Sequence, residues 1–158
     1  MAGGRRCAAR SSFGGDGNGL SMARQSVVEF RAVPFVKLFL RKGKPPEYLR
    51  SVADAVHDAL VAQANVPKDD RFQVIQELDD DALIAHPSYG GVNRSKDLII
   101  IEITLNAGRT VDIKKNLYAD IARQLQDAAD VRPDDVLISL IEVTKENWSF
   151  GGGRATYA

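Results

Sequence analysis

Asn65-Val66-Pro67-Lys68-Asp69-Asp70 and Asp130-Val131-Arg132-Pro133-Asp134-Asp135 are two copies of one short motif, and together they decide the fold. The copies lie 65 positions apart. The same offset pairs further residues on both sides of the motif, namely Glu77 with Glu142, Leu60 with Leu125, and Leu40 with Leu105. A solenoid needs at least about three repeats. Two copies therefore predict a duplicated unit that closes around a pseudo-twofold axis.

The first copy, about 34–78, reads as strand, helix and strand. A short apolar stretch over 35–40 ends in a basic, glycine-containing turn, as a strand does. Pro45 and Pro46 suit the first turn of a helix, where the missing N–H has no cost. Residues 71–78 follow as the second strand.

The second copy, about 99–143, has the same order. Its first strand, over 98–105, is the most apolar of the chain and is expected to be buried on both faces. Thr110 can cap the helix, and 136–143 forms the last strand. Right-handed crossovers then predict an α+β fold, a four-stranded mixed sheet with two helices on one face. The other face is apolar and is expected to pack against other subunits.

The composition excludes several functional classes. The chain has 158 residues with 21 Lys+Arg and 21 Asp+Glu, so no basic excess points to a nucleic acid or an anionic membrane. No apolar run is long enough to span a bilayer. Cys7 is the single cysteine and there are 2 histidines, which disfavours disulfides and metal sites. We expect a cytoplasmic domain over 34–158 that binds no metal.

Residues 1–33 differ in composition from the rest. They are rich in Gly, Arg and Ser, hold only Asp16 and Glu29 as acidic residues, and have no periodic apolar stretch before Val27. Three interpretations remain: an organellar transit peptide, a disordered natural tail, or translation from upstream of the true start. Val33 can be encoded by GTG, an alternative bacterial start codon, and the next residue is Pro34.

Two segments lie outside the repeat. The connection over 79–97 is long enough to suggest a functional loop. The tail over 147–158 places Trp148 and Phe150 before a run of glycines, which predicts a glycine-hinged β-hairpin with exposed aromatic side chains. Such a tail is expected to reach a neighbouring subunit.

The sequence from 34 onward resembles the tautomerase superfamily, whose β-α-β members use an amino-terminal proline as the catalytic group. The likeness is carried by Pro34-Phe35-Val36-Lys37, Val66-Pro67-Lys68-Asp69-Asp70-Arg71-Phe72-Gln73-Val74, Asn93-Arg94-Ser95-Lys96 and Trp148-Ser149-Phe150-Gly151. The fused two-repeat length is most similar to the malonate semialdehyde decarboxylase branch. The resemblance implies a cofactor-independent enzyme that forms a homotrimer, with active sites near the subunit boundaries.

The resemblance makes Pro34 the candidate catalytic residue. An internal proline nitrogen is an amide without basicity, whereas an amino-terminal proline is a secondary amine that can move protons. Translation from Val33, read as the initiator Met and then removed, would expose this amine. The resemblance also matches Asp70 to a carboxylate that activates water or orients substrate. Its repeat partner Asp135 is expected to be structural.

The remaining candidates bind substrate. By resemblance, Trp148 and Phe150 form an aromatic wall. The decarboxylase holds its substrate carboxylate with two arginines, whose positions here are Asn106 and Gly108. Arg109 lies one residue further on, and this shift disfavours decarboxylation because bidentate carboxylate binding is geometrically demanding.

Other residues on the chain supply charge outside these positions. Arg94 is a second candidate cation, equally well interpreted as a solvated loop residue. Lys37 and Glu102, at equivalent repeat positions, are expected to form a structural or inter-subunit ion pair.

Three functions follow. The leading prediction is a tautomerase in which Pro34 acts as general base or acid on a small enol or keto acid, with phenylpyruvate-like aryl enols as promiscuous substrates. The second is decarboxylation or hydration of a three-carbon keto acid such as malonate semialdehyde. The third is a non-catalytic trimeric binding protein in which the extension masks Pro34.

Overall fold

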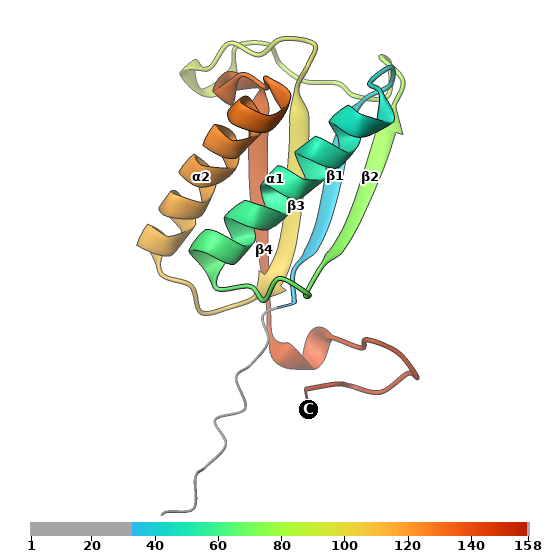
Figure 1. The fold of residues 1–158 in the computed structure, drawn as a ribbon, viewed down its shortest axis with the longest axis vertical. Coiled ribbons are helices and arrows are strands. Elements are labelled where there is room, and N and C mark those ends of the chain that lie inside the picture. The colour runs from blue at the N-terminus through green and yellow to red at the C-terminus, as the bar shows by residue number, and fades with distance from the viewer. Residues whose placement is uncertain (1–32, 158) are drawn as a thin grey trace, which may run out of the picture.

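A computed structural model describes residues 33–157. The first repeat consists of β1 (Phe35–Arg41), α1 (Pro46–Ala64) and β2 (Phe72–Leu78). The second consists of β3 (Ile99–Asn106), α2 (Val111–Ala129) and β4 (Val136–Val143). The four strands form one sheet in the order β2-β1-β3-β4, and both helices cover the same face of it (Figure 1). The predicted α+β fold is confirmed.

The strand register shows the duplication directly. Phe35 pairs with Phe72 in the parallel β1–β2 ladder, and Ile99 pairs with Val136 in the parallel β3–β4 ladder. In both ladders the two paired residues are 37 positions apart in the chain. The two units meet at the antiparallel β1–β3 ladder in the middle of the sheet. This arrangement is the pseudo-twofold that the repeated motif predicts.

The repeated motif acts at the ends of the helices. α1 ends at Asn65 and α2 at Asp130, and both residues have left-handed backbone angles, with φ of 55° and 52°. Asn and Asp tolerate this conformation better than most residues because their short polar side chains can bond locally. Each helix therefore stops at the same place and turns the chain back toward the sheet. The turns end in Asp70 and Asp135, just before β2 and at the start of β4.

The core lies between the helices and the sheet. Alternate strand residues point at the helices and are at most 2% exposed, for instance Leu38 in β1 and Ile101 in β3. They pack against apolar helix residues such as Leu60, Leu117 and Ile121. Burying one such side chain contributes about 1.5–3 kcal/mol, so this layer dominates the stability of the fold.

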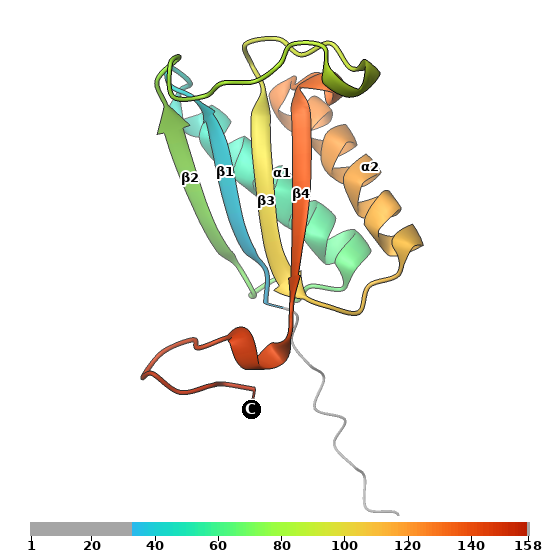
Figure 2. The same cartoon turned by 180° about the vertical axis from the view of Figure 1, so that it is seen from behind.

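The second face of the sheet carries no helix (Figure 2). The prediction that β3 is buried on both faces is therefore only half right within one chain. Glu102 and the other residues of β3 on this second face are half-buried. The exception is Asn106, at the end of the strand, which is buried. Lys37 and Glu102 pair across β1 and β3 with 2.7 Å between the charged atoms, so the predicted ion pair forms within the chain. Exposed apolar side chains lie on the outer strands of this face, namely Phe72, Val74, Leu137 and Ile141.

The residues after β4 do not form the predicted β-hairpin. A short 3-10 turn over Lys145–Asn147 is followed by a loop without strands in the described residues, which end at 157. The chain still reverses, because the Thr156 N–H donates to the Trp148 carbonyl at 3.1 Å. Gly151, Gly152 and Gly153 all have positive φ, which bends the segment too tightly for paired strands.

The sequence predicts a disordered or mis-annotated extension over 1–33. Of these residues the structure describes only Val33, so the prediction lies otherwise outside the described residues. In the described part of the chain, neither long helix is apolar enough to cross a lipid bilayer.

Candidate active site

All the predicted site residues except Arg94 converge at one edge of the sheet, formed by the ends of the strands. β1 and β2 begin at this edge and β3 and β4 end at it, so Pro34, Asp70 and Asn106 are all delivered to the same side of the fold. The segment after β4 passes below this edge, as Figure 1 shows, and carries Trp148 and Phe150 to it. The strand topology therefore assembles residues that lie more than a hundred positions apart in the sequence.

A pocket of about 260 Å³ opens at this edge. It is lined by Val33, Phe35, Phe72, Trp148, Ser149 and Phe150. The residues on both sides of Pro34 thus form part of its wall, and Pro34 itself is buried. Val33 is only 7% exposed and fills space beside the wall. The backbone nitrogen of Pro34 lies between these two lining residues in the chain.

Three aromatic rings build the wall of the pocket. The Trp148 and Phe150 rings are stacked with centroids 5.4 Å apart and planes 14° from parallel. Phe150 in turn stacks on Phe72 at 6.2 Å, which joins the C-terminal segment to β2. Tyr157 meets the Phe150 ring edge-on at 5.6 Å. Such pairs favour a fixed ring geometry.

Asp70 occupies a rigid turn at the same edge. It is 8% exposed, and its N–H donates to the Pro67 carbonyl at 3.0 Å. His57 of α1 supports the turn, because its Nε2 lies 2.9 Å from the Lys68 carbonyl oxygen. A carbonyl oxygen can only accept a hydrogen bond, so Nε2 is the ring nitrogen that carries the proton. Asp70 precedes Phe72 by two positions, and Phe72 is paired with Phe35, so the register places the Asp70 backbone near the start of β1.

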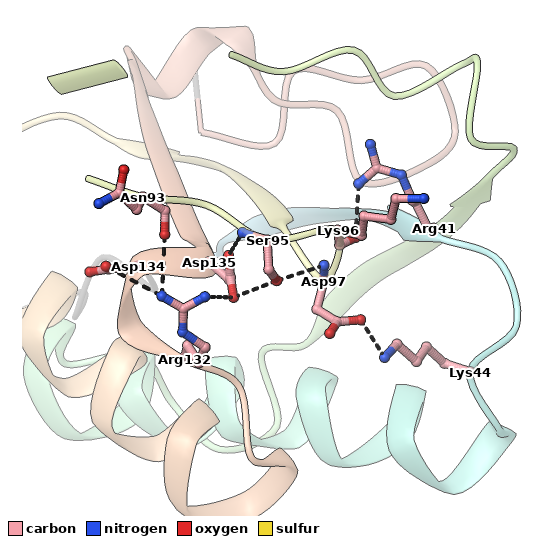
Figure 3. A network of polar contacts seen from close by, with 9 residues as sticks. All are labelled: Arg41, Lys44, Asn93, Ser95, Lys96, Asp97, Arg132, Asp134 and Asp135. Atoms are coloured by element: carbon pink, nitrogen blue, oxygen red, sulfur yellow. Dashed lines mark hydrogen bonds and ion pairs between the residues drawn. The ribbon is translucent and has the colours of Figure 1, made fainter. Parts of the chain in front are cut away.

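Asp135, the repeat partner of Asp70, has a different environment at the opposite edge of the sheet. It is 1% exposed and accepts two hydrogen bonds from Ser95, one from the backbone N–H at 2.5 Å and one from the hydroxyl at 2.8 Å. Arg132 adds an ion pair at 3.5 Å. Figure 3 shows these contacts as part of one polar network that fastens the 79–97 connection to the start of β4. The expected structural role of Asp135 agrees with this arrangement.

Asn106 and Arg109 reach the site edge without presenting a cation to the pocket. Asn106 is 8% exposed, and its Oδ1 accepts a hydrogen bond from the Trp148 indole at 2.8 Å. The Arg109 guanidinium donates to the Asn106 carbonyl at 2.9 Å and to the Ala64 carbonyl at 3.1 Å. Burial lowers the pKa of Arg109, and the nearby Glu142 only partly offsets this. In this structure Arg109 joins the end of α1 to the end of β3.

Arg94 is not brought to Pro34 within one chain. It belongs to the connection between the far end of β2 and the beginning of β3, and its Nη1 donates to the Tyr89 carbonyl at 2.8 Å. The strand β1 separates this end of the sheet from Pro34. Seven residues at about 3.3 Å each place the two ends about 23 Å apart. Only a second copy of the chain could bring an Arg94 to this pocket.

Sequence reasoning missed four contributors to the site. Phe35 and Phe72 lie inside the motifs that carry the family likeness. Phe35 alternates with buried residues of β1, which places it on the open face, and Phe72 is its partner in β2. Ser149 has no distinguishing pattern. His57 reads as one more residue of a helix and can be linked to the Asp70 turn only in three dimensions. Among residues 33–157, no group of three His, Cys, Asp or Glu side chains could hold a metal ion.

Two family models match the chain, both described as tautomerase enzyme. One covers residues 34–93 and the other residues 70–151. The probable tautomerase YusQ of Bacillus subtilis (strain 168) is 39% identical over 123 residues, which is 78% of this chain and 97% of that protein. The probable tautomerase YrdN of the same organism is 27% identical over 79% of this chain and 96% of its own length.

Solved structures agree with these relatives. A malonate semialdehyde decarboxylase is 28% identical with a TM-score of 0.72, covering 78% of this chain and 95% of its own. A second malonate semialdehyde decarboxylase, inhibited by 3-bromopropiolate, is 36% identical and has the same TM-score of 0.72. The match covers 78% of this chain and 93% of that protein. The chain therefore belongs to the tautomerase superfamily of enzymes, in the branch that resembles malonate semialdehyde decarboxylase.

Proposed function

We propose that the protein is a cofactor-independent keto-enol tautomerase in which the amine of Pro34 carries the proton. The observation that supports this most strongly is the place of Pro34: it is buried at the start of a central strand, between two residues that line an aromatic pocket. One family match also begins at residue 34. The proposed substrate is a small enol or keto acid that fits a pocket of about 260 Å³.

The proposed reaction needs one group that accepts a proton and returns it. The nitrogen of Pro34 takes the hydroxyl proton of the enol, and the O–H electron pair forms the π bond of the carbonyl. The C=C π bond breaks at the same time, and its electron pair takes the proton back from nitrogen to form the new C–H bond. A free α-amino group has a pKa of about 8, and an apolar wall lowers that pKa. Asp70, at the same edge, is proposed to orient the substrate or the water beside it. No other proton carrier is required.

This chemistry requires a chain that begins at Pro34. In the 158-residue chain the Pro34 nitrogen is an amide, and Val33 occupies space at the pocket. We therefore propose that the active form is 34–158, reached either by initiation at Val33 followed by removal of the initiator or by removal of the extension. Separating Pro34 from Val33 has two effects. It frees the amine of Pro34, and it removes Val33 from the pocket wall.

We also propose that the active form is a homotrimer. The apolar side chains on the open face of the sheet, such as Phe72 and Leu137, support a buried interface there. In sedimentation or size-exclusion experiments, 34–158 is expected at about three times the mass of one chain. A monomer at micromolar concentration would contradict the trimer and leave the tautomerase proposal standing.

The deciding experiment compares three proteins with the enol of phenylpyruvate as substrate, followed by ultraviolet absorbance. The chain over 34–158, with its amino terminus verified by intact mass, is expected to exceed the buffer rate. The 158-residue chain and Pro34→Ala with the same start are expected to fall to the buffer rate. Full activity in either of these two proteins would overturn the role of the Pro34 amine. A buffer rate for 34–158 itself would favour the binding protein. The intact mass of the protein from its native gene context shows which form exists.

A second candidate reaction is decarboxylation or hydration of malonate semialdehyde. Two solved relatives at 28% and 36% identity are malonate semialdehyde decarboxylases. Arg109, the nearest arginine to the equivalent positions, is bound to two backbone carbonyls in this chain. Release of carbon dioxide from malonate semialdehyde by 34–158, abolished by Arg109→Ala, would establish this reaction.

A further inference from the structure

The hydrogen bond between Asn106 and Trp148 joins the end of β3 to the segment that follows β4. Asn106 is the last residue of β3 and Trp148 follows β4 by five positions. The indole Nε1 donates to the Asn106 Oδ1 at 2.8 Å, and the Asn106 side chain is almost fully buried. The bond therefore forms away from bulk water, where a missing partner would cost more than it does on the surface.

The position of Asn106 is itself fixed from the other side. Its backbone carbonyl accepts a hydrogen bond from Arg109, whose guanidinium also holds the carbonyl of Ala64 at the end of α1. Because Asn106 is the last residue of β3 and pairs with Val143 of β4, its backbone is held by the sheet and not by a loop. A rigid acceptor can orient the ring that donates to it.

Trp148 passes this orientation on to the pocket wall. Its ring is stacked on Phe150 at 5.4 Å, and Phe150 is stacked on Phe72 at 6.2 Å. The segment that carries Trp148 and Phe150 contains no strand among the described residues, so few backbone bonds restrain it. One of them is the bond from the Thr156 N–H to the Trp148 carbonyl. The side-chain bond to Asn106 ties the aromatic wall to the sheet.

We propose that Asn106 is a positioning residue for the reaction, acting through Trp148: it sets the angle of the indole and through it the shape of the aromatic wall beside Pro34. This inference rests on the proposed function for its kinetic consequence. It assigns to Asn106 a role other than contact with a substrate carboxylate. The side-chain oxygen is used by the indole, and the chain holds no cation at this position.

The chain offers a direct optical readout of this bond, because Trp148 is its only tryptophan. Asn106→Leu keeps a side chain of similar size and removes the acceptor, so the indole is expected to turn toward water. Its emission is then expected to move to longer wavelength, with stronger quenching by acrylamide. Asn106→Asp retains an acceptor and is expected to keep the wavelength of the natural chain. Gln73→Leu is the matched control, since it removes the bond from Gln73 to the Ala53 carbonyl on the opposite face.

The kinetic arm uses 34–158 with the enol of phenylpyruvate. Asn106→Leu and Trp148→Phe, which removes the donor, are each expected to lower kcat/KM about tenfold, the change that one buried hydrogen bond commonly makes. The double variant is expected to lose no more than either single one, because both remove the same bond. Gln73→Leu is expected to leave kcat/KM within about twofold.

Each outcome decides the inference. An unchanged emission wavelength in Asn106→Leu, or losses that add in the double variant, would show that the bond does not position the ring. A shifted emission with unchanged kcat/KM would show that the position of the ring has no bearing on the reaction. If Pro34→Ala retains full activity while the emission and additivity tests hold, the proposed proline chemistry fails and the positioning of the wall by Asn106 stands.

Discussion

Removal of the Asp135 carboxylate should destabilise the fold more than any other single change in the polar network of Figure 3. Asp135 is 1% exposed and accepts two hydrogen bonds from Ser95, at 2.5 and 2.8 Å. Hydrogen bonds to a charged group each contribute about 1.5–3 kcal/mol. Asp135→Ala removes both and leaves the Ser95 N–H without its acceptor, so we expect a loss of about 4 kcal/mol. For a folded region of this size, the melting temperature should fall by about 10–15 °C.

Asp134→Ala is the matched control for this change. Asp134 is the neighbouring residue and makes only an ion pair with Arg132 at 3.6 Å, with half of its side chain exposed. An exposed pair of this kind contributes at most about 1 kcal/mol. Urea unfolding of the natural chain and both variants, at one fixed chain concentration, gives the two free energies of unfolding with their slopes.

The contrast between the two variants tests the reasoning. If Asp135→Ala loses no more stability than Asp134→Ala, the buried carboxylate does not fasten the connection to β4, and its assignment as a structural residue is wrong. In 34–158, the folded fraction of Asp135→Ala should keep the kcat/KM of the unsubstituted protein, because the network lies at the opposite end of the strands from Pro34. A loss of kcat/KM per folded molecule would equally refute the assignment.

Three further results are expected. Thr110→Ala removes the side-chain oxygen that accepts the Ile113 N–H at 3.3 Å and should lower the free energy of unfolding by about 1 kcal/mol in urea. Burial raises the pKa of Asp120, but hydrogen bonds, led by the one from Arg123, outweigh it and hold the pKa below its usual value. The ionised Asp120 therefore stabilises the fold above about pH 4, and this contribution is lost as the pH falls through the folded pKa. Urea midpoints from pH 5 to pH 3 should fall less steeply in Asp120→Asn. Leu137→Lys places a charge on the open face of the sheet and should shift 34–158 to a lower mass in sedimentation, whereas an unchanged mass would move the interface elsewhere.

The repeated motif predicts the fold well because it encodes a local event. Asn65 and Asp130 end their helices in left-handed conformations that few other residues adopt without cost, so the sequence signal and its structural effect lie at the same positions. The edge at which Pro34, Asp70 and Asn106 meet follows from strand direction alone. Once the order strand, helix, strand is known, the ends that share an edge are determined.

The predictions that fail concern side-chain direction and loop geometry. Nothing near Arg109 indicates that its guanidinium also reaches the carbonyl of Ala64, because the packing of α1 against α2 brings that carbonyl there. The bond from Trp148 to Asn106 joins residues 42 positions apart without any shared pattern. The position of Arg94, however, follows from topology: a connection leaving the far end of β2 cannot return to the beginning of β1.

The duplication has a consequence for how many reactive centres one chain can hold. Ile99 stands in the second repeat where Pro34 stands in the first, and its nitrogen is joined to Leu98 in every form of the chain. A polypeptide has one amino terminus, so fusing two β-α-β units leaves one of the two symmetric positions permanently unable to become an amine. That second position, held by the fully buried Ile99, can therefore contribute to the core alone. The repeat partners Asp70 and Asp135 differ as well, since Asp135 is bound to Ser95 at the other end of the strands.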